Sequence, residues 1–180
     1  IHTLIKSSKI SFPVVIKPIN EGSSIGVYIC TKKNLSKNLK KLKEYNQILV
    51  EEYISGREIQ VAVMNNRALG AIELKPKRKF YDYQAKYSSK AKTKHIMPAP
   101  LEQKKYKEVL SIAKEAHILL GCKGISRSDF RYNNKKFFLL EVNTQPGMTN
   151  LSLVPEIATY KGIKFENLVG WMVKDASYDR

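Results

Sequence analysis

The sequence predicts an α+β protein with antiparallel sheets and flanking helices. Five segments with β-branched or apolar enrichment, separated by short polar breaks, occur within the first 74 residues. Farther on, one segment has the apolar spacing of an amphipathic helix, and two strand-like segments flank a turn-rich Asn-Asn pair. The strand segments predict sheets, and the helical segment predicts a helix that packs on them.

The first half of the chain is dominated by strands. The predicted strands cover residues 12–17, 26–30, 48–52, 58–64 and 68–74. One short helix is predicted between the second and third strands, at residues 34–44. Residues 75–100 are polar, rich in Lys, Tyr and Ser, and without a sustained period, which predicts a long loop. A loop of this length in a compact domain is usually a functional lid or a disordered segment.

The second half of the chain begins with a helix predicted at 102–120. Its apolar residues recur at the helical period, and Gly121 offers a C-terminal stop. The apolar face expected in the core consists of Val109, Ile112, Ala113, Ala116, Leu119 and Leu120. The remaining predicted elements are a hairpin of strands 124–132 and 136–142 around Asn133-Asn134, and short helices at 153–160 and 165–174.

Length and composition set the broad class. With 180 residues and 43% hydrophobic content, the chain can form one compact domain or two small lobes. No apolar run approaches the roughly 18 to 20 residues that a membrane-spanning helix needs, so we expect a soluble protein without a membrane partner. The chain begins at Ile1 without a clear signal or element, which we interpret as a truncated beginning. Cys30 and Cys122 lack disulfide or metal spacing, which favours free thiols in a reducing, cytoplasmic compartment.

The net charge of +16 comes mainly from lysine, which accounts for 26 of the 32 basic residues. A basic nucleic-acid-binding module is one interpretation of this charge. The lysines are scattered over predicted helix faces, for example at Lys37, Lys40 and Lys41, without the Arg-aromatic clusters typical of nucleic-acid recognition. We therefore favour a solvated surface and anionic small ligands, with no nucleic-acid partner.

Two polar side chains stand at the end of the last predicted strand, where the chain reads LLEVNTQPG from residue 139. Glu141 and Asn143 are two residues apart, so on a strand they point to the same face. A hairpin around 133–135 would bring Asp129 opposite or nearly opposite Glu141, whereas a one-residue shift in register would place them on different faces. In the first register the three residues form an all-oxygen cluster that suits Mg²⁺ or Mn²⁺. The alternative is a solvated hairpin edge.

A second motif, KPINEGSSIG at residues 17–26, combines Lys17 with a small-residue loop and the hydroxyls of Ser23 and Ser24. Backbone N–H groups and hydroxyls of such a loop can approach phosphate oxygens, while the lysine supplies charge. The lysine precedes the glycines and no GK[ST] follows, so the segment departs from the P-loop pattern. A plain hairpin turn is equally consistent with it.

Two further motifs have the chemistry of a nucleotide site. In VEEYISGREIQVAV, Glu51 and Glu52 could meet an adenine amino group and Glu58 a ribose hydroxyl, or all three are exposed carboxylates. FYDYQAKY at residues 80–87 carries four aromatic residues and one lysine. It could form a lid that excludes water from a reactive intermediate, or its aromatic residues could pack the loop on the body.

Taken in order, KPINEGSSIG, VEEYISGRE, YDYQAKY, SRSDF and EVNTQPGMTNLSLVP resemble the ATP-grasp ligases, and within them the D-alanine:D-alanine ligases. The motifs follow the family's order and cover roughly residues 12–155. The resemblance implies the ATP-grasp fold, with residues 1–56 as part of the central lobe and 57–180 as the C-terminal lobe. The C-terminal lobe would carry the lid loop 75–100 and a metal-binding hairpin at 124–143.

The resemblance also implies a set of ligands for ATP and its metal ions. The nucleotide contacts it implies are Lys17 and Lys86 at the phosphates, Ser24 in the loop that closes over them, Glu51 and Ile54 at the adenine, and Glu58 at the ribose. Two Mg²⁺ (or Mn²⁺) ions would bridge the phosphates, held by Asp129, Glu141 and Asn143.

The implied reaction joins two D-alanines to D-alanyl-D-alanine for peptidoglycan synthesis. A free carboxylate is a poor acyl donor, so the γ-phosphate of ATP first converts it to an acyl phosphate, which the amine of the second D-alanine attacks. The catalytic and substrate contacts implied are Arg127 and the backbone N–H of Gly147 at the developing oxyanion, Ser152 and Leu153 near the second substrate's carboxylate, and Ser23 and Tyr87 in a set that orients the substrates. Tyr87 also favours the dipeptide over D-alanyl-D-lactate.

Some features depart from the family's pattern. SRSDF has Ser128 where an apolar residue is common, although the resemblance assigns no ligand role to this position. Family members also carry an N-terminal domain with a catalytic glutamate, which does not precede Phe12 here. We therefore expect the C-terminal portion of a ligase, inactive alone, whose complete form could be a homodimer. Another ATP-grasp carboxylate-amine ligase is the alternative within the fold.

Overall fold

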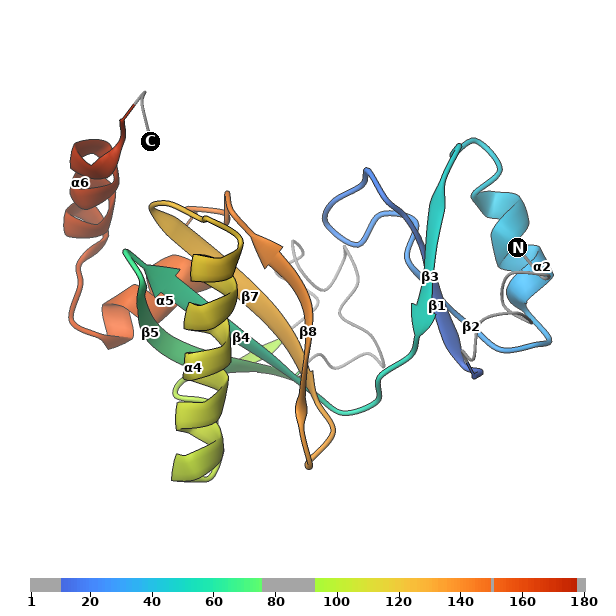
Figure 1. The fold of residues 1–180 in the computed structure, drawn as a ribbon, viewed down its shortest axis with the longest axis horizontal. Coiled ribbons are helices and arrows are strands. Elements are labelled where there is room, and N and C mark those ends of the chain that lie inside the picture. The colour runs from blue at the N-terminus through green and yellow to red at the C-terminus, as the bar shows by residue number, and fades with distance from the viewer. Residues whose placement is uncertain (1–10, 76–92, 150, 178–180) are drawn as a thin grey trace. The chain divides into compact units, whose positions relative to one another are not determined.

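The computed structural model describes residues 11–75, 93–149 and 151–177 (Figure 1). These residues fall into two compact units, each with its own sheet and its own hydrophobic core. The first unit extends to Ile54, and the second comprises Ser55–Lys75 and the chain from Lys94 onward.

The first unit is a three-stranded antiparallel sheet with one short helix. Its elements are β1 (Val14–Pro18), β2 (Tyr28–Cys30), α2 (Leu35–Lys41) and β3 (Ile48–Glu52), in the strand order β2-β1-β3. Successive side chains of a strand point to opposite faces, and Val14 and Ile16 of β1 are both fully buried. They pack with Cys30, Leu35 and Leu42, so α2 covers this face of the sheet.

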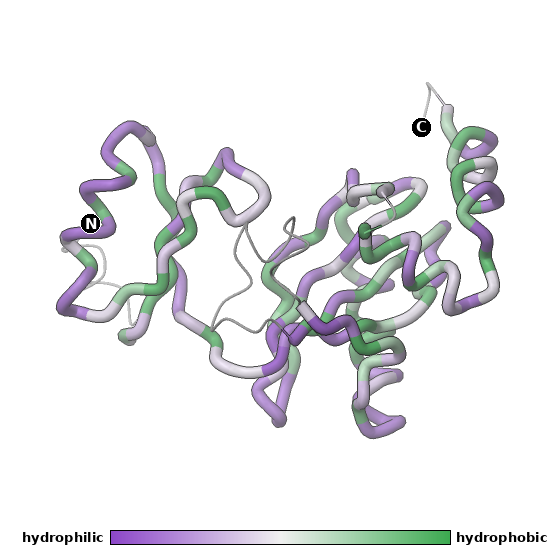
Figure 2. The backbone as a smooth tube through the Cα atoms, turned by 180° about the vertical axis from the view of Figure 1, so that it is seen from behind, coloured by the Kyte–Doolittle hydropathy of each residue, from purple (hydrophilic) through white to green (hydrophobic). Residues whose placement is uncertain are grey.

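The second unit is a five-stranded antiparallel sheet with three helices. Its elements are β4 (Arg57–Met64), β5 (Arg67–Lys75), β6 (Lys94–Ile96), α4 (Gln103–Leu119), β7 (Ile125–Tyr132), β8 (Phe137–Asn143), α5 (Leu153–Tyr160) and α6 (Phe165–Asp175). The strand order is β6-β5-β4-β7-β8. In Figure 1, α4 lies in front of the sheet and α5 lies behind it. Figure 2 shows that hydrophilic residues gather at the tip of the β7–β8 hairpin.

The core of the second unit lies between α4 and one face of the sheet. Val109 and Ala113 of α4 are fully buried against β4 and β7, as the helical period predicted. The third buried position of α4 is His117, four residues after Ala113, whose Nδ1 lies 2.7 Å from the hydroxyl of Ser126. The predicted burial of Leu119 and Leu120 is wrong: they are 77% and 65% exposed, at the last helical residue and the C-cap, beyond the last buried position of α4.

Most of the predicted elements are confirmed, with ends that differ by three residues or fewer. The prediction of one loop over residues 75–100 is wrong in part, because β6 pairs antiparallel with the end of β5. Residues 76–92 lie outside the described residues. Cys30 and Cys122 are free, as expected. In the part of the chain that the structure describes, no helix has the length and apolar character to cross a membrane.

Candidate functional site

The β7–β8 hairpin has the register that joins the predicted metal ligands. Asp129 lies directly opposite Glu141, and Arg127 lies opposite Asn143. Toward the turn, Phe130 pairs with Leu139, so a β-bulge adds one extra residue to β8 at Leu140. Without this extra residue Glu141 would point to the α4 face; with it, all four polar side chains share the other face of the sheet.

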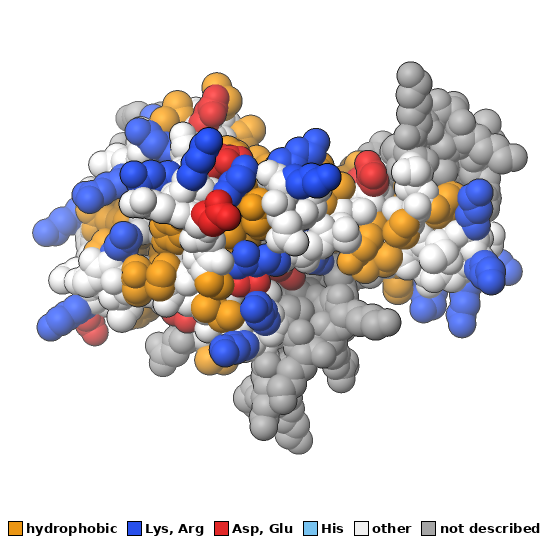
Figure 3. Space-filling view, turned by 90° about the horizontal axis from the view of Figure 1, so that it is seen from below, with side chains coloured by type: hydrophobic (Ala, Val, Ile, Leu, Met, Phe, Trp, Pro, Cys, Tyr) orange, Lys and Arg blue, Asp and Glu red, His pale blue; other side chains and the backbone are white. Residues whose placement is uncertain are grey.

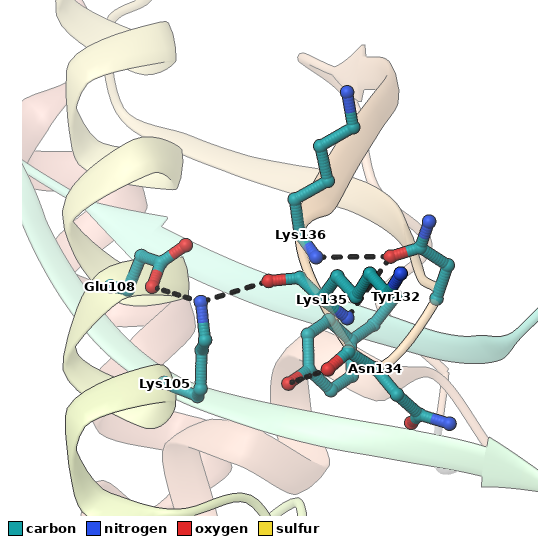
Figure 4. Close-up of polar contacts among 7 residues, drawn as sticks. Lys105, Glu108, Tyr132, Asn134, Lys135 and Lys136 are labelled. Atoms are coloured by element: carbon teal, nitrogen blue, oxygen red, sulfur yellow. Dashed lines mark hydrogen bonds and ion pairs between the residues drawn. The ribbon is translucent and has the colours of Figure 1, made fainter.

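Hydrogen bonds within the turn and from a lysine of α4 hold the turn of this hairpin (Figure 4). The Asn133 side-chain oxygen accepts hydrogen bonds from the backbone N–H groups of Lys135 and Lys136, at 3.1 and 3.0 Å. Lys105 of α4 donates to the carbonyl of Lys135 at 3.0 Å and pairs with Glu108 at 2.8 Å. The hairpin is therefore attached to the helix that packs on the sheet, which stabilises its register.

The predicted oxyanion donor and a predicted metal ligand are in contact. Arg127 donates from Nε and Nη2 to the two oxygens of Asp129, at 2.7 and 2.9 Å. Both side chains are largely buried, with 14% and 11% exposed. A bidentate pair of this kind is a strong charge-assisted contact, so Arg127 compensates the carboxylate charge in this arrangement.

The chemistry of this face fits a hard divalent cation. Asp129 and Glu141 offer carboxylate oxygens, and Asn143 offers an amide oxygen that already accepts the Gln145 N–H at 2.9 Å. Gln60 of β4, directly opposite Asp129 on its other side, adds a side-chain carbonyl that is buried and has no hydrogen-bond partner. Among the described residues no group of three or more His, Cys, Asp or Glu side chains could hold a metal ion; the predicted set differs, since it has two carboxylates and an amide.

The loop before α5 brings two predicted substrate contacts together. The Ser152 hydroxyl accepts the Thr149 N–H at 2.9 Å, and a Cβ placed on Gly147 would lie 2.9 Å from the same oxygen. The backbone of Gly147 therefore passes close to Ser152, at the start of α5. Leu153 is 7% exposed, so its backbone N–H at the helix start is better placed than its side chain to meet a carboxylate.

The first unit contains the predicted phosphate loop. Lys17 forms an ion pair with Glu51 across the sheet, with Nζ and Oε1 2.7 Å apart. Ser23 and Ser24 have φ angles of 53° and 62°, in the left-handed region that non-glycine residues seldom adopt. Each such residue costs on the order of 1 kcal/mol or more, and such strain is concentrated in ligand-binding and switch segments. Two consecutive residues with positive φ also form the type I′ turn of a hairpin, so this backbone conformation fits both the phosphate loop and the plain turn.

The remaining predicted site residues are distributed between the two units. Ile54 ends the first unit and is partly buried, whereas Glu58 lies on β4 of the second, opposite Arg131. Lys86 and Tyr87 lie outside the described residues. Gln60 was not among the predicted site residues; it is a polar residue inside an apolar strand, two positions after Glu58 and therefore on the same face.

The sheet, hairpin and loops described above define an ATP-grasp protein, and comparison with known proteins gives the family. The chain belongs to the family described as D-ala D-ala ligase C-terminus, which matches residues 3–174. It is 64% identical over 171 residues to a D-alanine--D-alanine ligase of Pelagibacter ubique, covering 95% of this chain and 56% of that protein. The predicted fold and family are therefore confirmed.

Two solved structures show the same fold. A D-alanine--D-alanine ligase from Bacillus anthracis, complexed with ATP, has a TM-score of 0.77 at 27% identity and covers 93% of this chain and 53% of its own. The VanG D-Ala:D-Ser ligase from Enterococcus faecalis has a TM-score of 0.81 at 28% identity and covers 96% and 52%. The chain thus spans about half the length of the proteins it matches.

Proposed function

We propose that this chain supplies the phosphate loop, the metal-binding hairpin and the oxyanion donors of an ATP-dependent D-alanine:D-alanine ligase. The observation that carries the proposal is the hairpin register, which puts Asp129 opposite Glu141 and Arg127 opposite Asn143 in a chain of this family. A nucleic-acid module would need a continuous basic patch. On the face shown in Figure 3, Lys and Arg side chains are instead scattered among hydrophobic and acidic ones.

In the proposed reaction, the γ-phosphoryl group of ATP passes to the carboxylate of one D-alanine, giving ADP and an acyl phosphate. The amine of the second D-alanine then attacks the acyl carbon, loses a proton and displaces phosphate. Lys17 and the loop with Ser24 bind the nucleotide phosphates, and Arg127 with the Gly147 N–H binds the oxyanion of the tetrahedral intermediate. Mg²⁺ or Mn²⁺ held by the hairpin oxygens would supply charge neutralisation at the phosphates.

The second substrate is proposed to be D-alanine. The two solved relatives have similar identities to this chain, although one is named for D-alanine and the other for D-serine. The 64% identical relative is named a D-alanine--D-alanine ligase, which supports the dipeptide product and a place in peptidoglycan synthesis. The free thiols of Cys30 and Cys122 support a cytoplasmic location. A homodimer of the complete enzyme stays a prediction, to be measured by light scattering.

The test is a chimera in which the N-terminal part of the Pelagibacter ubique ligase is joined to this chain at the matched position. With ATP, Mg²⁺ and D-alanine the chimera should release phosphate and form D-alanyl-D-alanine. Parallel assays with D-serine or D-lactate as second substrate should give much less product. A folded chimera that forms no D-alanyl product under these conditions would refute the proposal.

A further inference from the structure

We infer that Gln60 belongs to the cation site of the second unit. Its Oε1 would accept a hydrogen bond from water bound to the cation that Asp129, Glu141 and Asn143 hold. The inference rests on the proposed function, and it adds a positioning residue from a strand that the predicted ligand set did not include.

The first observation is the state of the Gln60 side chain. The residue is 2% exposed, and Oε1 is buried without a hydrogen-bond partner. A buried carbonyl without a donor carries a free-energy penalty, so such atoms are rare in native structures and need an explanation. A donor absent from the protein itself, such as a bound water, is one explanation.

The second observation is where Gln60 lies in the sheet. Gln60 on β4 pairs directly with Asp129 on β7, and Asp129 pairs directly with Glu141 on β8. Directly opposite residues of antiparallel strands have Cβ atoms about 4.5–5.5 Å apart and share a face. The three side chains therefore form one row across three neighbouring strands, with Asp129 at its centre.

The third observation concerns hydrogen bonding between Gln60 and Asp129. Two acceptor oxygens cannot bond to each other, and both Asp129 oxygens already accept from Arg127. A hydrogen-bond donor located between the two side chains would satisfy Gln60 Oε1. Mg²⁺ usually keeps several of its waters when carboxylates bind it, and those waters are donors to nearby carbonyls.

A different orientation of the same amide gives the competing explanation. If the NH₂ group of Gln60 occupied the place of Oε1, it could donate to Asp129 and act as a structural tie without a cation. That explanation predicts that replacing the amide destabilises the metal-free fold. Our inference predicts that replacing it weakens cation binding instead.

The chain contains a matched control. Ser128 also has a buried oxygen without a partner, and it is 0% exposed. It lies opposite Val61 and Val142, on the face of the sheet that packs on α4, one residue from Asp129 along the strand. Ser128→Ala should therefore leave cation binding unchanged.

The experiment measures Mn²⁺ binding to the chimera in the presence of ADP, by the electron paramagnetic resonance signal of free Mn²⁺. Gln60→Met keeps the shape of the side chain and removes its acceptor. We expect it to weaken Mn²⁺ binding about five- to thirty-fold, equivalent to about 1–2 kcal/mol at 1.4 kcal/mol per factor of ten. The melting temperature without metal should stay equal or rise, since an unpaired buried oxygen is removed.

The outcomes separate this inference from the proposed function. If the unaltered chimera binds no Mn²⁺, the cation site itself is wrong and the inference falls with it. If it binds Mn²⁺ and Gln60→Met binds equally well, only the inference is overturned, and a lower metal-free melting temperature would then identify the structural tie. Should Gln60→Met fail to fold, Gln60→Glu retains an acceptor and must bind Mn²⁺ at least as tightly as the unaltered protein; weaker binding would overturn the inference.

Discussion

Replacing Arg57 with methionine should destabilise the second unit more than replacing Glu73 with glutamine. Arg57 donates from Nε and Nη2 to the two oxygens of Glu73, at 2.9 and 2.7 Å, across β4 and β5. The Glu73 side chain is 1% exposed, whereas that of Arg57 is 27% exposed. Removing the arginine leaves a carboxylate buried without its partner, while removing the carboxylate charge leaves a guanidinium that water reaches.

The sizes follow from this asymmetry. Breaking a buried ion pair by removing one partner costs about 3–5 kcal/mol. Arg57→Met should reach that range, because it also removes the hydrogen bond from Nη2 to the carbonyl of Pro100 at 3.0 Å. Glu73→Gln should cost about 1–3 kcal/mol, since the amide keeps one acceptor and the exposed part of Arg57 is rehydrated. The double variant Arg57→Met/Glu73→Leu should recover much of the loss, as apolar replacement of whole buried pairs often does.

Urea unfolding followed by the fluorescence of Trp171, the single tryptophan of the chain, measures these differences in the free energy of unfolding. The control is Arg67→Met, an exposed arginine at the start of β5, which should change stability by about 0.5 kcal/mol or less. The reasoning is refuted if Glu73→Gln costs as much as Arg57→Met. It is also refuted if the double variant Arg57→Met/Glu73→Leu is no more stable than Arg57→Met alone.

Three further predictions concern the site and the fold. In the chimera, Glu141→Gln should lower turnover by about 10²–10³-fold, whereas the control Glu166→Gln on α6 should leave turnover unchanged. Both residues are exposed, so the free energy of unfolding of each variant should stay within about 0.5 kcal/mol of the parent. A folded Glu141→Gln variant with parental turnover would contradict the metal assignment. Burial lowers the pKa of His117 below its ordinary value, so the unfolded state binds this proton first as pH falls. The stability that neutral His117 contributes is complete above about pH 6.5 and is lost at lower pH. In a series of melting temperatures measured at different pH values, His117→Gln should therefore show a smaller decrease at low pH than the parent. The same decrease in both proteins would contradict this prediction. The isolated chain should not release phosphate in response to D-alanine, because alignment of reactants can be worth about 7–11 kcal/mol and the chain covers only 56% of its Pelagibacter ubique relative. Turnover near one per second would show that the catalytic unit is smaller than we infer.

Periodicity predicted most of this fold because the segments are long enough for a period to be counted. β4 and β5 have eight and nine residues, and both were predicted with ends that differ by at most one residue. β6 was missed because it lies in a polar stretch without a period, and it exists through pairing with β5, a tertiary effect. The exposure of Leu119 and Leu120 also depends on where the helix ends relative to the sheet, which apolar spacing alone does not determine.

The sequence indicated the residues of the candidate site but not how they are arranged. The i, i+2 spacing of Glu141 and Asn143 was enough to expect a shared face, because the period of a strand is two. It was not enough to choose between registers for Asp129, because that choice depends on a one-residue bulge without a sequence signal of its own. The contact of Arg127 with Asp129 is likewise a three-dimensional result, although both residues belong to one motif.

The bulge explains how one hairpin can serve the core and the polar face together. Near the turn, Tyr132 and Phe137 are directly opposite and stacked with ring centroids 4.3 Å apart, which holds the apolar register on the α4 side. If that register continued unchanged, Asp129 would oppose Leu140, and Glu141 would be directed toward the buried face with Ser128. A carboxylate on that face would lie at the half-buried position that Val142 now occupies opposite Ser128, where it would lose part of its hydration. The extra residue at Leu140 therefore allows aromatic packing at the turn and a row of Gln60, Asp129 and Glu141 farther along the same strands.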